Sequence, residues 1–145
     1  MPAKGSTKQS TARRNEAYVD TSALNAFADR SDSHHNLYRR LFSDPPPLIT
    51  TPLVVAEGHG WFLKRYDSSR GLQFLSMIES MPLDIIAVGK PEQIAASVII
   101  RKYSDQDITV TDAVGLHLMS IRRIHICWST DHHLGLTKVP LVIHS

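Results

Sequence analysis

Short apolar runs alternate with amphipathic segments along most of the chain. Each apolar run ends at a polar or turn-forming residue, and together they predict strands at 17–20, 48–50, 83–88, 124–128 and 139–143. Apolar residues at helical spacing between the runs predict helices at 24–28, 34–42, 52–65, 69–80, 91–103 and 109–120. Alternating strands and helices favour an α/β fold, a three-layer α/β/α sandwich with a mostly parallel, Rossmann-like central sheet.

Several residues indicate where these helices begin. Ser33 and Thr51 precede two of the predicted helices as candidate N-caps, and Pro52 occupies the first helical position, where a missing N–H costs nothing. Within the helix that starts at Pro52, Gly58 and Gly60 interrupt the apolar pattern. We interpret these glycines as a sign of close packing near Glu57.

The charge of the chain is concentrated at its start. Its formal net charge is +2, yet residues 1–16 carry Lys4, Lys8, Arg13 and Arg14 against Glu16. We therefore expect residues 1–16 to form a basic, flexible N-terminal tail, because they have few apolar side chains to bury. Residues 17–145 have the length of one ordinary domain.

The composition argues against several classes of protein. No apolar run approaches the ~20 residues of a bilayer span, so we expect a soluble, cytoplasmic protein with no membrane contact. Cys127 is the only cysteine and has apolar neighbours, which predicts a buried, inert thiol. The chain has no Gly-x-Ser-x-Gly, Gly-x-Gly-x-x-Gly or phosphate-loop motif, so serine hydrolases, dinucleotide-binding proteins and nucleoside triphosphatases gain no support.

Four acidic residues lie where a predicted strand ends or a predicted helix begins: Asp20, Glu57, Asp112 and Asp131. In a parallel sheet these positions open onto the same edge, so carboxylates far apart in sequence can meet there. Three of them also have a purely structural interpretation. Asp20 and Asp131 could cap the elements that follow them, and Asp112 fits a capping box that begins at Thr109.

Glu57 is harder to explain structurally, because it follows the apolar run Leu53-Val-Val-Ala. An unpaired buried carboxylate is costly, so Glu57 needs a partner or a metal ion. Four converging carboxylates would also repel one another unless a cation neutralises them.

Oxygen-only ligands select Mg²⁺ or Mn²⁺, and such a site can orient a phosphodiester and activate water. The pattern thus predicts a metal-dependent nuclease. A phosphoacceptor receiver domain also has acids at strand ends, but it needs a late lysine after a strand, and Lys138 falls in a predicted loop.

Four segments resemble, in order, the successive motifs of the PIN domain: 18–22 (YVDTS), 50–57 (TTPLVVAE), 103–113 (YSDQDITVTDA) and 128–133 (WSTDHH). The closest resemblance is to VapC-type proteins, the ribonuclease toxins of toxin-antitoxin pairs. It implies a PIN-like, Rossmann-like domain over residues 17–145, a homodimer and a small antitoxin partner. It also implies hydrolysis of single-stranded or structured RNA with Mg²⁺ or Mn²⁺.

By motif position, the resemblance makes Asp20, Glu57, Asp112 and Asp131 the catalytic metal ligands. The same comparison makes Thr21, Ser22 and Asp105 supporting polar groups.

The sequence departs from the family pattern after Asp131. Such proteins usually have a His-Phe pair and then several residues before a glycine, whereas here His133 is followed at once by Leu134 and Gly135. This departure leaves a second hypothesis open: a catalytically impaired PIN-fold module for RNA binding or protein interaction. Four basic doublets near predicted helix C-termini are explained by the helix dipole, with contacts to RNA phosphates as the alternative.

Overall fold

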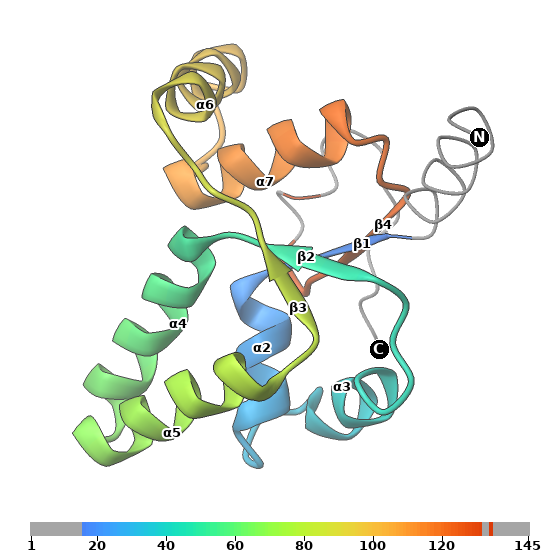
Figure 1. Ribbon diagram of the computed structural model, residues 1–145. Helices are drawn as coiled ribbons and strands as arrows, with labels where there is room; N and C mark the ends of the chain where they lie inside the picture. Colours follow the sequence, from blue (N-terminus) through green and yellow to red (C-terminus); the bar gives the residue numbers. More distant parts are fainter. Residues whose placement is uncertain (1–15, 132–133, 135–145) are drawn as a thin grey trace, which may run out of the picture.

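The computed structural model describes residues 16–131 and Leu134. Four short strands, all parallel, form one sheet in the order β3-β2-β1-β4 (Figure 1). The strands are β1 (Ala17–Val19), β2 (Leu48–Thr50), β3 (Leu83–Ile85) and β4 (Ile126–Trp128). The helices are α2 (Thr21–Ala28), α3 (His35–Leu41), α4 (Pro52–Arg65), α5 (Ser68–Ser80), α6 (Lys90–Lys102) and α7 (Val110–Ile121).

Helices cover both faces of this sheet. Figure 1 shows α6 and α7 on one side, and α2, α3, α4 and α5 on the other. Neighbouring helices pack in pairs, α6 with α7 and α4 with α5, while α2 contacts both α3 and α4. The predicted three-layer α/β/α fold with a parallel sheet is therefore confirmed. The longest of the described helices has 14 residues, which is too short to cross a bilayer.

Three of the described strands are shorter than the sequence predicted: β1 by one residue, and β3 and β4 by more. The apolar run 83–88 pairs only as far as Ile85, which lies opposite Thr50, and the Ile86 N–H makes one further bond to the Thr50 carbonyl. β2 can go no further because Thr51 already caps α4. Likewise Ile124 is not in β4, because its N–H bonds to the Met119 carbonyl in the turn that follows α7.

Five of the six described helices begin one to three residues away from the predicted start, and α2 and α3 show why. α2 starts directly after β1, at Thr21 rather than at Leu24, because the Asp20 carbonyl already accepts the first helical bonds. α3 starts at His35, and its start is held by Asp32 rather than by Ser33: the Asp32 carboxylate accepts a 2.7 Å hydrogen bond from the His34 N–H.

Other local predictions are confirmed. Thr51 and Thr109 cap α4 and α7, and each accepts a bond from the backbone N–H three residues on. Cys127 is buried, and burial raises the pKa of its thiol well above the ordinary value. The predicted strand at 139–143 and the tail up to residue 15 lie outside the described residues.

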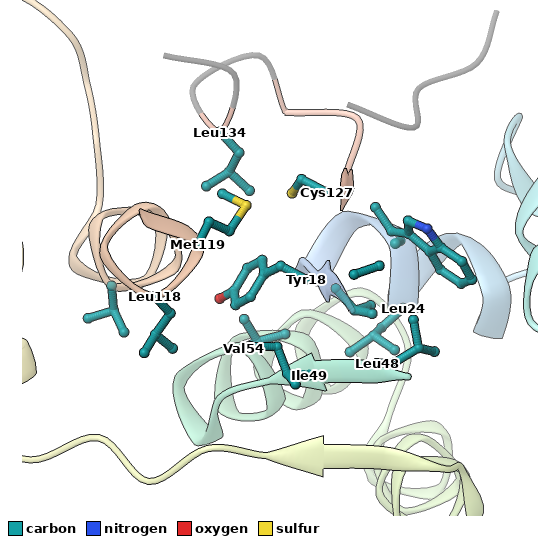
Figure 2. Close-up of a cluster of buried hydrophobic side chains, with 14 of the residues drawn as sticks. Tyr18, Leu24, Leu48, Ile49, Val54, Leu118, Met119, Cys127 and Leu134 are labelled. Carbon is teal, nitrogen blue, oxygen red and sulfur yellow. The ribbon is translucent and has the colours of Figure 1, made fainter. Parts of the chain in front are cut away.

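Tyr18 is the central aromatic residue of the core between β1 and α7. Its side chain is buried, and Figure 2 shows it pointing from β1 toward α7, beside Met119 and above Val54 of α4. A Cβ atom at Gly115 would lie 2.8 Å from the Tyr18 ring. The absence of a side chain at Gly115 thus lets α7 approach the sheet.

The two glycines of α4 differ in their surroundings. A Cβ atom at Gly58 would overlap the Phe74 ring of α5, coming within 2.9 Å of Phe74 Cε2, so the predicted close packing is confirmed there. At Gly60 a Cβ atom would meet nothing within 4 Å, so the same prediction is wrong for this residue.

We predict opposite effects for the same substitution at two helical glycines. Gly115→Ala should lower the free energy of unfolding by about 1–3 kcal/mol, because the new methyl group displaces the buried Tyr18 ring. Gly60→Ala should raise it by up to about 1 kcal/mol, because the methyl group meets open space and alanine favours the helix. Urea unfolding followed by circular dichroism measures both changes, and a neutral Gly115→Ala variant would contradict the packing argument.

Candidate acidic site at the carboxyl ends of the strands

Asp20 lies at the junction of β1 and α2, with its side chain buried. It occupies the N-cap position, but its side chain makes no capping bond. Instead, Asp20 Oδ2 accepts hydrogen bonds from Ser129 Oγ at 2.9 Å and Ser22 Oγ at 3.0 Å. Burial raises the pKa of Asp20, and the two serine hydroxyls offset part of that rise because they stabilise the carboxylate.

The two serines connect the end of β1 to the end of β4. Ser129 Oγ accepts a 2.8 Å bond from the Asp131 N–H, and Ser22 Oγ accepts a 3.0 Å bond from the Thr130 N–H. Each hydroxyl therefore donates to Asp20 and accepts from the backbone of the loop that carries Asp131. This pairing fixes that loop next to Asp20.

Asp112 lies in the first turn of α7, and its side chain is buried. The helix cap uses the Asp112 backbone N–H, which bonds to Thr109 Oγ1 at 3.1 Å, so the cap does not require its carboxylate. Burial raises the pKa of Asp112 to about 6, and the charges of Asp131, Asp20 and Glu57 contribute to the rise. The charges of the other three predicted acids thus reach Asp112.

Glu57 is exposed, so the expectation that it lies buried in an apolar stretch is wrong. The buried face of α4 follows Val54, Gly58 and Phe62 at intervals of four residues, and Glu57 lies beside this stripe on the solvent side. Its charge still raises the pKa of Asp112. Glu57 therefore lies at the open rim of the site.

Asp131 is half-buried in the loop after β4, and its charge raises the pKa of both Asp20 and Asp112. The loop is anchored by Leu134, whose side chain is fully buried and whose N–H bonds to the Asp131 carbonyl at 3.2 Å. Figure 2 shows Leu134 above Met119 in the core. An apolar side chain thus fills the core at the position where the PIN motif usually has phenylalanine.

The remaining predicted residues lie in different surroundings. Ser22 contacts Asp20, as described above, and Thr21 is buried beside it. Among the described residues, Thr21 Oγ1 has no hydrogen-bond partner. Asp105 is exposed in the turn after α6, whereas the charges acting on Asp112 come from the other three acids.

Ser129 is a site residue that the sequence did not single out. The signal available was its place between Trp128 and Asp131, at the end of a strand. A serine in such a loop is common, and only the pairing of β4 with β1 brings its hydroxyl to Asp20.

The chemistry of the donors fits a hard divalent cation. In residues 16–131 and Leu134, no three acidic, histidine or cysteine side chains form a ready-made metal-binding group. The four predicted acids nevertheless offer only oxygen ligands, and two of them, Asp20 and Asp112, are buried with raised pKa values. A nearby cation would reverse this rise in pKa, and the buried Thr21 hydroxyl supplies a further oxygen without a partner.

A solved toxin structure has a similar architecture. VapC20 from Mycobacterium tuberculosis, a sarcin-ricin loop cleaving toxin, has a TM-score of 0.78 at 18% identity, over 85% of this chain and 95% of that one. This is the PIN-like fold of VapC toxins. The fold implied by the four sequence motifs is thereby confirmed.

Two further solved structures share the PIN-like fold. One belongs to a toxin-antitoxin complex from Klebsiella pneumoniae, with a TM-score of 0.59 at 17% identity, over 88% of this chain and 96% of that one. The other belongs to VapBC2 from Rickettsia felis bound to a promoter DNA fragment. Its TM-score is 0.64 at 10% identity, and the match covers 90% of this chain and 99% of that one. No protein-family model and no curated protein sequence matches the chain.

We predict a pH-dependent cost of ionising Asp112. Folded Asp112 keeps its proton up to about pH 6, against 3.8 for the ordinary group, so the folded state binds more protons between these values. The stability that protonated Asp112 contributes to the folded state is therefore lost as the pH rises from 3.8 to about 6. The measured quantity is the free energy of unfolding of Asp112→Asn minus that of the unsubstituted protein. Without divalent cations, this difference should increase by about 2 kcal/mol from pH 4.5 to pH 7.

Urea unfolding in EDTA at each pH measures this difference. The control is Asp44→Asn, which removes an exposed carboxylate in the loop between α3 and β2 and should leave the pH profile unchanged. Parallel profiles for Asp112→Asn and the unsubstituted protein would contradict the raised pKa.

Proposed function

We propose that this protein is a metal-dependent endoribonuclease, the toxin of a toxin-antitoxin pair. The observation that carries the proposal is the placement of Asp20 and Asp131 at the carboxyl ends of the paired strands β1 and β4, where Ser129 links them, with the buried Asp112 close enough for their charges to raise its pKa. Such a concentration of negative charge is unfavourable without a cation, and it is what the binding of Mg²⁺ or Mn²⁺ to carboxylates requires.

Each acid has its own role in this proposal. Asp20 and Asp112, both buried, hold the cation, with Asp20 oriented by the two serine hydroxyls on its Oδ2 atom. Glu57 and Asp131, which are more accessible, complete the ligand set from the open side. Thr21 and Ser22 support it, whereas the exposed Asp105 has a lesser role at the periphery.

The bound cation would supply the chemistry of phosphodiester hydrolysis, by orienting the phosphate, offsetting its negative charge and lowering the pKa of the attacking water. The contribution of the protein is to hold carboxylates of like charge together. The core beneath them does this, through the Tyr18 packing and the hydrogen bonds between β1 and β4. The exposed rim leaves the site open to a polymer substrate.

The similar structures support RNA as the substrate and a protein as the partner. The relative from M. tuberculosis cleaves the sarcin-ricin loop, and the relatives from K. pneumoniae and R. felis are parts of toxin-antitoxin complexes. For this chain we infer an RNA substrate, single-stranded or structured, a small antitoxin, a homodimer and a cytoplasmic location. The alternative, a catalytically impaired module for RNA binding or protein interaction, is motivated by the segment after Asp131, of which the structure describes only Leu134, with its side chain buried.

We predict that two substitutions reduce activity to different degrees. Ser129→Ala removes a hydrogen bond that orients Asp20 and should lower RNA cleavage in Mg²⁺ by about 10- to 100-fold. Asp20→Asn removes the proposed ligand itself and should cause a loss of more than about 100-fold. Cleavage of a mixed RNA substrate by purified proteins measures both, with Asp44→Asn as the control at full activity.

Equal cleavage by the Asp20→Asn variant would overturn the proposal. So would a purified protein that cleaves no RNA in Mg²⁺ or Mn²⁺ and does not slow bacterial growth when it is expressed.

Metal binding can be tested independently of cleavage. Mn²⁺ should raise the thermal midpoint of the unsubstituted protein, because a ligand of the folded state stabilises it by mass action. The increase should vanish in Asp20→Asn and Asp112→Asn and persist in Asp44→Asn. Differential scanning fluorimetry across a Mn²⁺ titration measures this, and equal midpoint increases in all four proteins would mean that Mn²⁺ binds elsewhere.

A further inference from the structure

A basic surface lies at the opposite end of α2 from Asp20. An open hollow of about 670 Å³ is lined by Phe27, Arg30, His35, Asn36 and Arg39. A second hollow of about 430 Å³ shares two of these residues and adds Arg40 and Ser43. We name Arg30, His35, Asn36, Arg39 and Arg40 the α3 basic surface. Its residues come from the α2–α3 loop and from α3 itself, so the surface belongs to neither element alone.

The arginines of this surface lack carboxylate partners. Among the described residues, ion pairs within 4.0 Å join only Asp32 to His34 and Glu16 to Arg122. The neighbouring acid Asp29 accepts hydrogen bonds from Ser31 Oγ at 2.8 Å and from Tyr66 Oη at 2.9 Å. The guanidinium groups are therefore left exposed without local neutralisation in this part of the chain.

The helix dipole explains only part of this arrangement. Arg39 and Arg40 lie in the last turn of α3, where a cation is favoured. His35 is the first residue of that helix, so its place on this surface does not depend on the dipole at the helix C-terminus. Its position on the same hollow as Arg30 and Arg39 brings three side chains from different places onto one concave surface.

His35 has a defined hydrogen-bonding role. Its Nδ1 atom lies 2.9 Å from the Ala26 carbonyl oxygen, which can only accept, so Nδ1 carries the proton that is donated. In the neutral ring the Nε2 atom is then an acceptor. The hollow thus offers guanidinium donors together with one imidazole acceptor.

We propose that the α3 basic surface binds the sugar-phosphate backbone of an RNA strand whose scissile bond would lie at the proposed acidic site. Arg30 and Arg39 match phosphate oxygens with their planar forks, Asn36 adds an amide donor, and His35 Nε2 accepts from a ribose 2′-hydroxyl. This inference rests on the proposed ribonuclease function and adds a second point of contact to it.

The distance between the two sites suits a short stretch of RNA. α2 has eight residues and so spans about 12 Å from Asp20 to the hollow. A stacked strand advances about 3.4 Å per nucleotide, so roughly three to four nucleotides would connect the two sites. A carboxylate side chain offers His35 Nε2 no donor, so an acidic peptide would have to reach it with backbone N–H groups or uncharged side chains, whereas every ribose of RNA carries a 2′-hydroxyl that can donate.

Fluorescence anisotropy with a labelled 12-nucleotide single-stranded RNA tests this proposal. Binding is measured in EDTA, which prevents metal-dependent cleavage, from 50 to 200 mM KCl. Arg30→Gln and Arg39→Gln should each weaken binding by roughly tenfold at the lowest salt concentration. Each should also reduce the slope of log affinity against log salt by up to about 0.7, the value for one phosphate contact on a single strand.

Matched controls separate this surface from general charge effects. Arg101→Gln removes an exposed arginine from the last turn of α6, on the other face of the sheet, and should change neither affinity nor slope. His35→Ala should weaken binding of the RNA more than binding of a DNA oligomer of the same sequence. The four substituted residues are at least partly exposed: Arg30, His35, Arg39 and Arg101. Unchanged thermal midpoints would show that the variants are folded.

Two results would overturn the inference. One is equal affinity and salt slope for Arg30→Gln, Arg39→Gln and Arg101→Gln. The other is that Arg30→Gln and Arg39→Gln weaken the binding of a polyglutamate peptide more than they weaken the binding of RNA. That result would assign the surface to an acidic protein partner.

This binding assay, together with the cleavage assay described above, distinguishes the inference from the proposed function. If the protein binds RNA through Arg30 and Arg39 but never cleaves it, the proposed ribonuclease function is refuted and the inferred RNA-binding surface stands. If RNA cleavage depends on Asp20 but not on Arg30 or Arg39, the ribonuclease function stands and the inferred RNA-binding surface is refuted.

Discussion

The pairing of β1 with β4 is the interaction on which the candidate site depends. The two strands lie side by side in parallel, and the Asp20 N–H bonds to the Trp128 carbonyl at 3.0 Å where they end. This backbone bond brings Ser129 to Asp20 and fixes the start of the loop that carries Asp131. Residues more than a hundred positions apart thus share one set of hydrogen bonds, because parallel strands end at the same edge.

The site is electrostatically unfavourable, and the core beneath it compensates. Asp20 and Asp112 are buried near other acids, which raises the pKa of both. The helices that carry them are nevertheless held against the sheet by close packing, as at Gly115, where α7 meets Tyr18. In the proposed function, a cation bound by these carboxylates would relieve the repulsion between them.

Interpretation of the sequence succeeded where the determining contacts are local. The Thr51 and Thr109 caps bond to N–H groups three residues away. Asp20 and Asp112 lie at helix starts as predicted, whereas Glu57 lies inside α4 rather than at its end. The sequence prediction was wrong where burial decided the outcome. The apolar residues before Glu57 suggested burial, but the glutamate lies on the solvent side of α4, because Val54 and Gly58 define its buried face.

The sequence by itself determined the alternation of strands and helices, the capping residues and the order of the four acids, because these depend on residues close together along the chain. Only the tertiary structure decided where β3 ends, which serine contacts Asp20 and how Arg30, His35 and Arg39 come to share one hollow. These features require a partner from a distant segment. Such partners are fixed by strand pairing and helix packing, which no local pattern specifies.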